Sequence, residues 1–121
     1  MDAVLSVHRQ VAYALVLYYS AVGLWGLVLG VRGAGPSPGF RGAVAIAVIA
    51  SIAQGLLGAL VFFFRSAPAD ALHVLYGFAL VVAMPLAASL VRDRTARGQS
   101  VALGLAALFT AGLAIRGIIT A

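Results

Sequence analysis

Four long apolar segments, separated by short polar connections, constrain this chain more than any other feature of its sequence. They cover residues 11–31, 43–64, 71–91 and 101–119, and the first three carry no charged side chain. A helix needs about 20 apolar residues to cross a hydrocarbon core of about 30 Å, and each segment is close to that length. The sequence therefore predicts four transmembrane helices in a single domain over residues 1–121.

The composition excludes the main alternatives to a helical membrane protein. Hydrophobic residues make up 64% of the chain and charged residues 9%, whereas soluble domains average about 45–50% and about 25%. A soluble monomer could not cover its surface, and disorder requires low hydrophobicity. A membrane β-barrel needs segments of alternating polarity, but residues 43–50 are apolar on every side. The expected fold class is all-α and integral to the membrane.

The connections predict how the helices are arranged. Residues 32–42 contain two prolines and four glycines, which should interrupt a helix. Asp70 and Ser100 are placed to cap the third and fourth helices. Links this short make neighbouring helices antiparallel, in an up-down-up-down bundle. We expect helices at about residues 8–31, 42–65, 70–92 and 100–119.

The arginines predict an orientation. All eight basic residues are arginine, and the net charge is +5. Five lie at the end of the bundle that holds the first and third links, namely Arg32, Arg41, Arg92, Arg94 and Arg97. Three lie at the opposite end, namely Arg9, Arg65 and Arg116. Basic loops stay in the cytoplasm, so both termini should be extracytoplasmic. Arginine without lysine is typical of a GC-rich prokaryotic genome, so the expected location is the inner membrane of a prokaryotic cell. Nucleic acid is not an expected partner, because the arginines are explained by topology.

Two histidines are the strongest candidates for chemistry. His8 and His73 are the only histidines of the chain, and they fall at the same end of the first and third helices. These helices are diagonal in an up-down bundle, so the two imidazoles should face each other. Such a pair suits axial ligation of one b-type haem. Ala12 and Gly77, one turn further along each helix, would leave room for the porphyrin.

Other side chains at this end could complete a haem pocket. Haem propionates favour arginine, and aromatic residues are also close. The candidates are Arg9, Arg65, Arg116, Tyr76, Tyr13 and Tyr19. Two roles are open for Arg116: it faces a polar partner inside the bundle, or it extends to the lipid head groups. A zinc or copper site is a weaker interpretation, since no third ligand lies at the same depth.

Gln54 is the one strongly polar side chain near the middle of a predicted span. A buried amide in a membrane protein usually binds a neighbouring helix, so a structural role is the first interpretation. A contact to a ligand or a quinone is the second. Ser51, one turn away, could share its hydrogen bonds.

The arrangement resembles the small four-helix membrane cytochromes b, and the resemblance rests on His8 and His73. It implies a membrane electron-transfer protein, or a subunit of a redox complex, with one haem b per chain. The familiar members hold two haems on four histidines, and this chain has half that set. Its partner would then be a quinone or a larger redox complex at the outer face. Alternatives are a cofactor-free accessory subunit, packed as a homo-oligomer or on a partner, and a small transporter. A hydrolytic enzyme is not expected.

Overall fold

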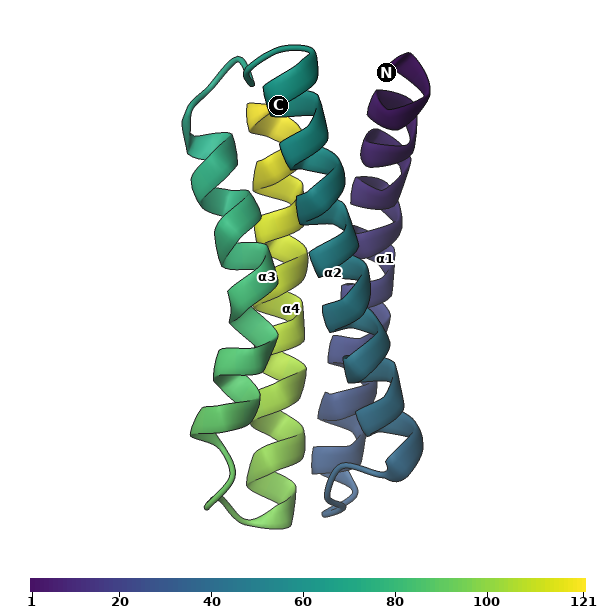
Figure 1. The fold of residues 1–121 in the computed structure, drawn as a ribbon. Helices are drawn as coiled ribbons and strands as arrows, with labels where there is room; N and C mark the ends of the chain where they lie inside the picture. The colour runs from purple at the N-terminus through teal and green to yellow at the C-terminus, as the bar shows by residue number, and fades with distance from the viewer.

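The computed structural model describes all 121 residues and contains four α-helices and no strands. The helices are α1 (Asp2–Val31), α2 (Pro38–Phe64), α3 (Leu72–Leu90) and α4 (Ala96–Thr120). Successive helices run antiparallel, and both termini lie at the same end (Figure 1). All four helices are long and apolar enough to cross a membrane. The predicted all-α class with four spans is therefore confirmed.

The first two helices begin earlier than predicted. α1 starts at Asp2 rather than near residue 8, and α2 starts at Pro38 rather than near residue 42. The Ser37 hydroxyl accepts a hydrogen bond from the Phe40 amide at 3.2 Å. Proline suits the first turn of a helix, where its missing N–H needs no partner. The second proline of the link therefore starts a helix instead of interrupting one.

Thr95, and not the predicted Ser100, caps α4. The helix begins at Ala96, and the hydroxyl of Thr95 accepts from the Gly98 amide at 3.1 Å. Ser100 lies one turn inside the helix and is buried. Its hydroxyl donates to the Ala34 carbonyl at 2.7 Å, so it ties α4 to the link after α1.

α3 is the shortest helix, at Leu72–Leu90 rather than residues 70–92. Ala71, and not the predicted Asp70, is the N-cap residue of α3, but the Asp70 carboxylate accepts a hydrogen bond from the Leu72 amide at 2.9 Å. Because the Asp70 amide also donates to the Thr120 carbonyl at 3.3 Å, the start of α3 is attached to the end of α4.

α1 and α4 pack with their backbones in close contact. A Cβ atom placed on Gly26 would lie 2.7 Å from the Cα of Gly104, which is closer than real side chains approach. Gly23 faces Leu108 and Gly30 faces Val101 in the same way. Small residues let membrane helices approach closely and gain van der Waals contact. This pair is the tightest interface of the bundle.

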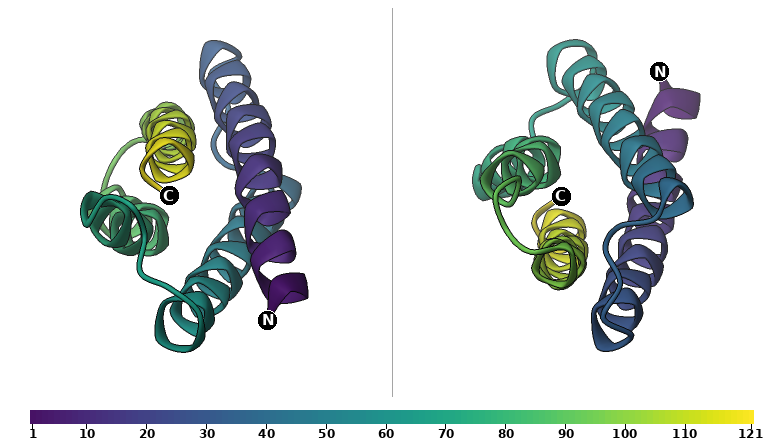
Figure 2. Two further views of the ribbon diagram at one scale, coloured as in Figure 1. Left: turned by 90° about the horizontal axis from the view of Figure 1, so that it is seen from above. Right: turned by 90° about the horizontal axis from the view of Figure 1, so that it is seen from below.

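Two tyrosines connect α1 to α2. The Tyr18 hydroxyl donates to the Ala43 carbonyl at 2.8 Å, and the Tyr19 hydroxyl is 2.5 Å from the Ser51 hydroxyl. Ser51 therefore pairs with Tyr19 and not with Gln54. α1 and α2 cross each other in the end-on views of Figure 2, whereas α3 and α4 run side by side.

Most of the surface of the bundle is apolar. Only 20 of the 121 residues are buried, and large aliphatic and aromatic side chains remain exposed along α2 and α3, among them Ile49, Leu56, Phe63, Leu75 and Phe78. Monomeric soluble proteins rarely expose such continuous apolar surface. Contact with a lipid bilayer accounts for it, and the chain is a multi-pass membrane protein by these criteria.

Candidate cofactor site

A cavity of about 740 Å³ lies at the end of the bundle that holds both termini. All four helices line it, together with residues 66–69 of the link between α2 and α3. Pockets for small ligands and cofactors commonly measure about 300–1,000 Å³ and are largely apolar. The cavity therefore has the size and character of a cofactor site.

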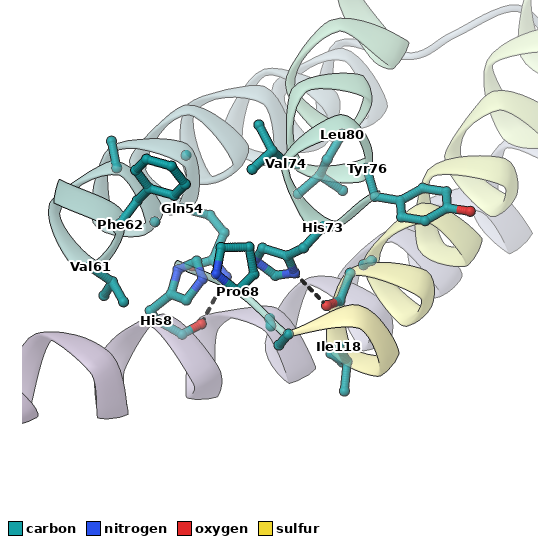
Figure 3. A pocket seen from close by; sticks show the side chains of 18 of the residues that line it. His8, Gln54, Val61, Phe62, Pro68, His73, Val74, Tyr76, Leu80 and Ile118 are labelled. Carbon is teal, nitrogen blue, oxygen red and sulfur yellow. Dashed lines mark hydrogen bonds between the residues drawn. The ribbon is translucent and has the colours of Figure 1, made fainter. Parts of the chain in front are cut away.

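The two histidines project into this cavity from diagonal helices, His8 from α1 and His73 from α3 (Figure 3). Their ring centroids are 6.1 Å apart, and the ring planes are inclined by 73°. The proximity predicted from the sequence is thus present, because equal depth on two parallel, diagonal helices brings the rings together.

The backbone of α4 holds the His73 imidazole. Its Nδ1 lies 2.8 Å from the Gly117 carbonyl oxygen, and the Thr120 hydroxyl is 3.5 Å away. A carbonyl can only accept, so Nδ1 carries the hydrogen, and in the neutral imidazole Nε2 then keeps its lone pair. Histidines that bind metals are usually oriented by such a bond.

His8 is held differently, by α2. The Gln54 side-chain nitrogen donates to the His8 backbone carbonyl at 2.8 Å (Figure 3). A Cβ atom on Gly58 would lie 3.0 Å from Cε1 of the His8 ring, so the ring packs closely on α2. Nδ1 of His8 and Oε1 of Gln54 are both buried without a hydrogen-bond partner. The structural role expected for Gln54 is present, and the amide also lines the cavity.

Small residues leave open space beside the histidines. Ala12 and Gly77 both line the cavity, as do Gly55 and Gly117. A Cβ atom on Gly77 or on Gly117 would meet no other side chain within 4 Å. Gly77 and Gly117 therefore enlarge the cavity rather than tighten helix packing.

The three arginines of this end have different surroundings. Arg9 lines the cavity. Arg65 forms an ion pair with Asp2, and Arg116 is exposed with its guanidinium 5.5 Å from the centre of the Tyr76 ring. Neither Arg65 nor Arg116 is among the lining residues, although Tyr76 itself is one.

The tyrosines divide in a similar way. Tyr13 lines the cavity with Tyr76, whereas Tyr19 lies deeper, fully buried in the hydrogen bonds between α1 and α2. Tyr19 faces α2 because its hydroxyl finds both a serine and a backbone carbonyl there.

A side opening between α2 and α3 was not anticipated from the sequence. Phe63 and Phe78 line the cavity while 76% and 70% of their surface is exposed, and Phe62 and Val74 are also exposed lining residues. These two helices pack more loosely than the other neighbouring pairs. Both helices are long and apolar enough to span a membrane, so this side of the cavity would face lipid. In the sequence, the run Phe62–Phe63–Phe64 at the end of α2 is the feature that could have indicated this opening.

No group of three or more His, Cys, Asp or Glu side chains comes together in the structure. The cavity is lined by two histidines and by no cysteine or acidic residue. No protein-family model matches the chain, and neither does any curated protein or solved structure. Assignment of a function depends on the geometry of the cavity.

Proposed function

We propose that this protein is a membrane electron carrier, or the subunit of a redox complex, that binds one b-type haem between His8 and His73. One observation carries the proposal: two imidazoles from diagonal helices lie with their centroids 6.1 Å apart in a largely apolar cavity. Haem, when bound, supplies reversible one-electron transfer at its iron.

The spacing of the two rings suits a shared metal ion. Bonds from imidazole nitrogen to a metal such as zinc are about 2.0–2.1 Å long, so two imidazoles on opposite sides of one ion have centroids roughly 6 Å apart. The separation of His8 and His73 is 6.1 Å. A haem needs only two axial ligands from the protein, because the porphyrin brings four nitrogens. Two histidines without a third ligand fit that requirement better than a zinc or copper site.

The remaining lining residues fit a porphyrin with acidic side chains. Ala12 and Gly77 leave space for the ring, and apolar residues of α2 and α3 surround it. Arg9 is the cation that could pair with a propionate. We assign Arg65 and Arg116 a supporting part only, through the ion pair with Asp2 and the contact with Tyr76.

The proposal includes an orientation and a class of partner. Five arginines lie at the end opposite the cavity, which favours a cytoplasmic location for that end. Both termini and the cavity would then face the outside of a prokaryotic inner membrane. The opening between α2 and α3 favours a lipid-soluble quinone as the redox partner, or a membrane subunit that covers the opening.

Difference spectroscopy tests the haem. We expect the purified protein, expressed with ample haem, to give a low-spin b-type signal in the reduced-minus-oxidised spectrum. Titration of the apoprotein with haem should saturate near one haem per chain. His8→Ala and His73→Ala should each lose the low-spin signal, because each removes one axial ligand.

Gln10→Ala is the matched control, since Gln10 is exposed two residues from His8 and bonds only to Ser6. It should keep the wild-type spectrum. Protein that stays colourless and does not bind added haem contradicts the proposal, and it favours a cofactor-free accessory subunit or a small transporter instead.

A further inference from the structure

The two imidazoles are not supported in the same way. Nδ1 of His73 has a carbonyl partner, whereas Nδ1 of His8 is buried without one. Gln54 is buried, with only 6% of its surface exposed. Its side-chain nitrogen has a hydrogen-bond partner, whereas its side-chain oxygen has none. Figure 3 shows the Gln54 side chain reaching from α2 to the backbone of His8.

The two unsatisfied atoms are chemically complementary. Oε1 of Gln54 can only accept a hydrogen bond, whereas Nδ1 of a neutral imidazole can carry a hydrogen. Leaving both atoms buried and unpaired is costly, because each has given up water without a replacement. One hydrogen bond between them would satisfy both. The side-chain nitrogen of Gln54 would stay on the His8 carbonyl.

We propose that Gln54 is a positioning residue that fixes the tautomer of His8. Its Oε1 accepts a hydrogen bond from Nδ1–H of His8, while its Nε2 remains bound to the His8 carbonyl oxygen. Nε2 of His8 then keeps its lone pair, as Nε2 of His73 does. Gly58 supports the arrangement, because the His8 ring packs against it and a side chain at this position would displace the ring.

A shared metal centre requires an unprotonated Nε2 on both histidines. The inference therefore deepens the proposed function and rests on it, because the tautomer has this use only if the two histidines bind a metal. The tautomer itself is a property of the protein without haem. A hydrogen bond from the second nitrogen orients a metal-binding histidine and makes it a stronger donor. In the haem-bound protein, the stronger donor stabilises the oxidised iron.

The tautomer is measured by NMR on apoprotein with ¹⁵N-labelled histidine rings, at mildly alkaline pH. We expect His8 and His73 to show the Nδ1–H tautomer in the wild type. In Gln54→Leu, His8 should shift towards Nε2–H or a mixture, while His73 stays unchanged. Gln54→Glu keeps an acceptor and should restore Nδ1–H at His8.

Ser51→Ala is the control variant, since Ser51 is a buried polar residue one turn away on α2 that bonds to Tyr19. It should leave both rings unchanged. An Nε2–H tautomer at His8 in the wild type overturns the inference, and so does an unchanged His8 in Gln54→Leu.

A second measurement uses the haem-loaded protein. The midpoint potential should be higher in Gln54→Leu than in the wild type, and Ser51→Ala should leave it unchanged. Equal potentials in Gln54→Leu and the wild type overturn the inference while the proposed function stands. A protein with the expected tautomers that binds no haem overturns the proposed function alone.

Discussion

Gly77 is the residue that best tests where a ligand would lie. It is one turn from His73, and a Cβ atom placed on it meets no other side chain within 4 Å. The side chain of Gly77→Leu should therefore enter the cavity and fill part of it. We expect haem affinity to fall at least about tenfold, which corresponds to about 1.4 kcal/mol. Haem titration measures the loss of affinity, and thermal unfolding shows whether the variant stays folded.

Gly112 provides the matched control for that substitution. It is also a helical glycine with open space at its Cβ, but it does not line the cavity. Replacing a helical glycine changes helix propensity by no more than about 1 kcal/mol, so Gly112→Leu and Gly77→Leu should both stay folded. Wild-type affinity in Gly77→Leu would show that the ligand does not occupy the space beside this residue.

At the residue scale, the sequence predicted at which level of the bundle a side chain lies but not which side of its helix it faces. His8 and His73 could be paired because α1 and α3 run in the same direction and each carries its histidine near its start. Arg116 could not be placed, because α4 is apolar on several sides and its pattern does not show which side faces inward. A long arginine side chain adds further freedom. Its contact with Tyr76 and the separate ion pair of Arg65 therefore appeared only in the structure.

At the scale of helices, the strongest prediction concerns the interface between α1 and α4. A Cβ atom on Gly26 would lie 2.7–2.9 Å from backbone atoms of Gly104 and Ser100. Backbone cannot move aside as a flexible side chain can, so Gly26→Ala overpacks the interface. Overpacking typically costs about 1–3 kcal/mol, and we expect a loss of that size in reversible unfolding in detergent.

Gly112→Ala should behave in the opposite way. The added methyl group meets nothing within 4 Å, so only the better helix propensity of alanine remains, worth up to about 1 kcal/mol. If both alanine variants were equally stable, the close approach of α1 to α4 would not be a determinant of stability.

The sequence predicted the number and order of the helices and missed their ends. Long apolar segments determine that a helix must cross the membrane, because lipid offers no partner for an open backbone. Helix ends lie outside lipid, where single hydrogen bonds decide between neighbouring candidates. Thr95 rather than Ser100 caps α4, because Ser100 is buried against Ala34. The loose contact of α2 with α3 also escaped prediction, because both are apolar on all sides.

At the scale of the whole molecule, charge and cavity lie at opposite ends. The links at residues 32–37 and 91–95 are at one end of the bundle, whereas the termini and residues 65–71 are at the other (Figure 1). The end without the cavity carries most of the arginines. Each basic residue near an anionic cytoplasmic surface contributes about 1 kcal/mol, so the imbalance should favour one orientation.

Single cysteines test this orientation cleanly, because the chain contains none of its own. Ser66 lies in the link beside the cavity and Asp93 in a link at the opposite end, and both are exposed. In intact cells a membrane-impermeant maleimide should label Ser66→Cys, and it should label Asp93→Cys only after permeabilisation. Asp93→Cys also removes the one acid among the arginines of its link, so it strengthens the charge bias it reports on. The reverse labelling pattern would place the cavity in the cytoplasm, and its redox partner would then have to be sought on that side.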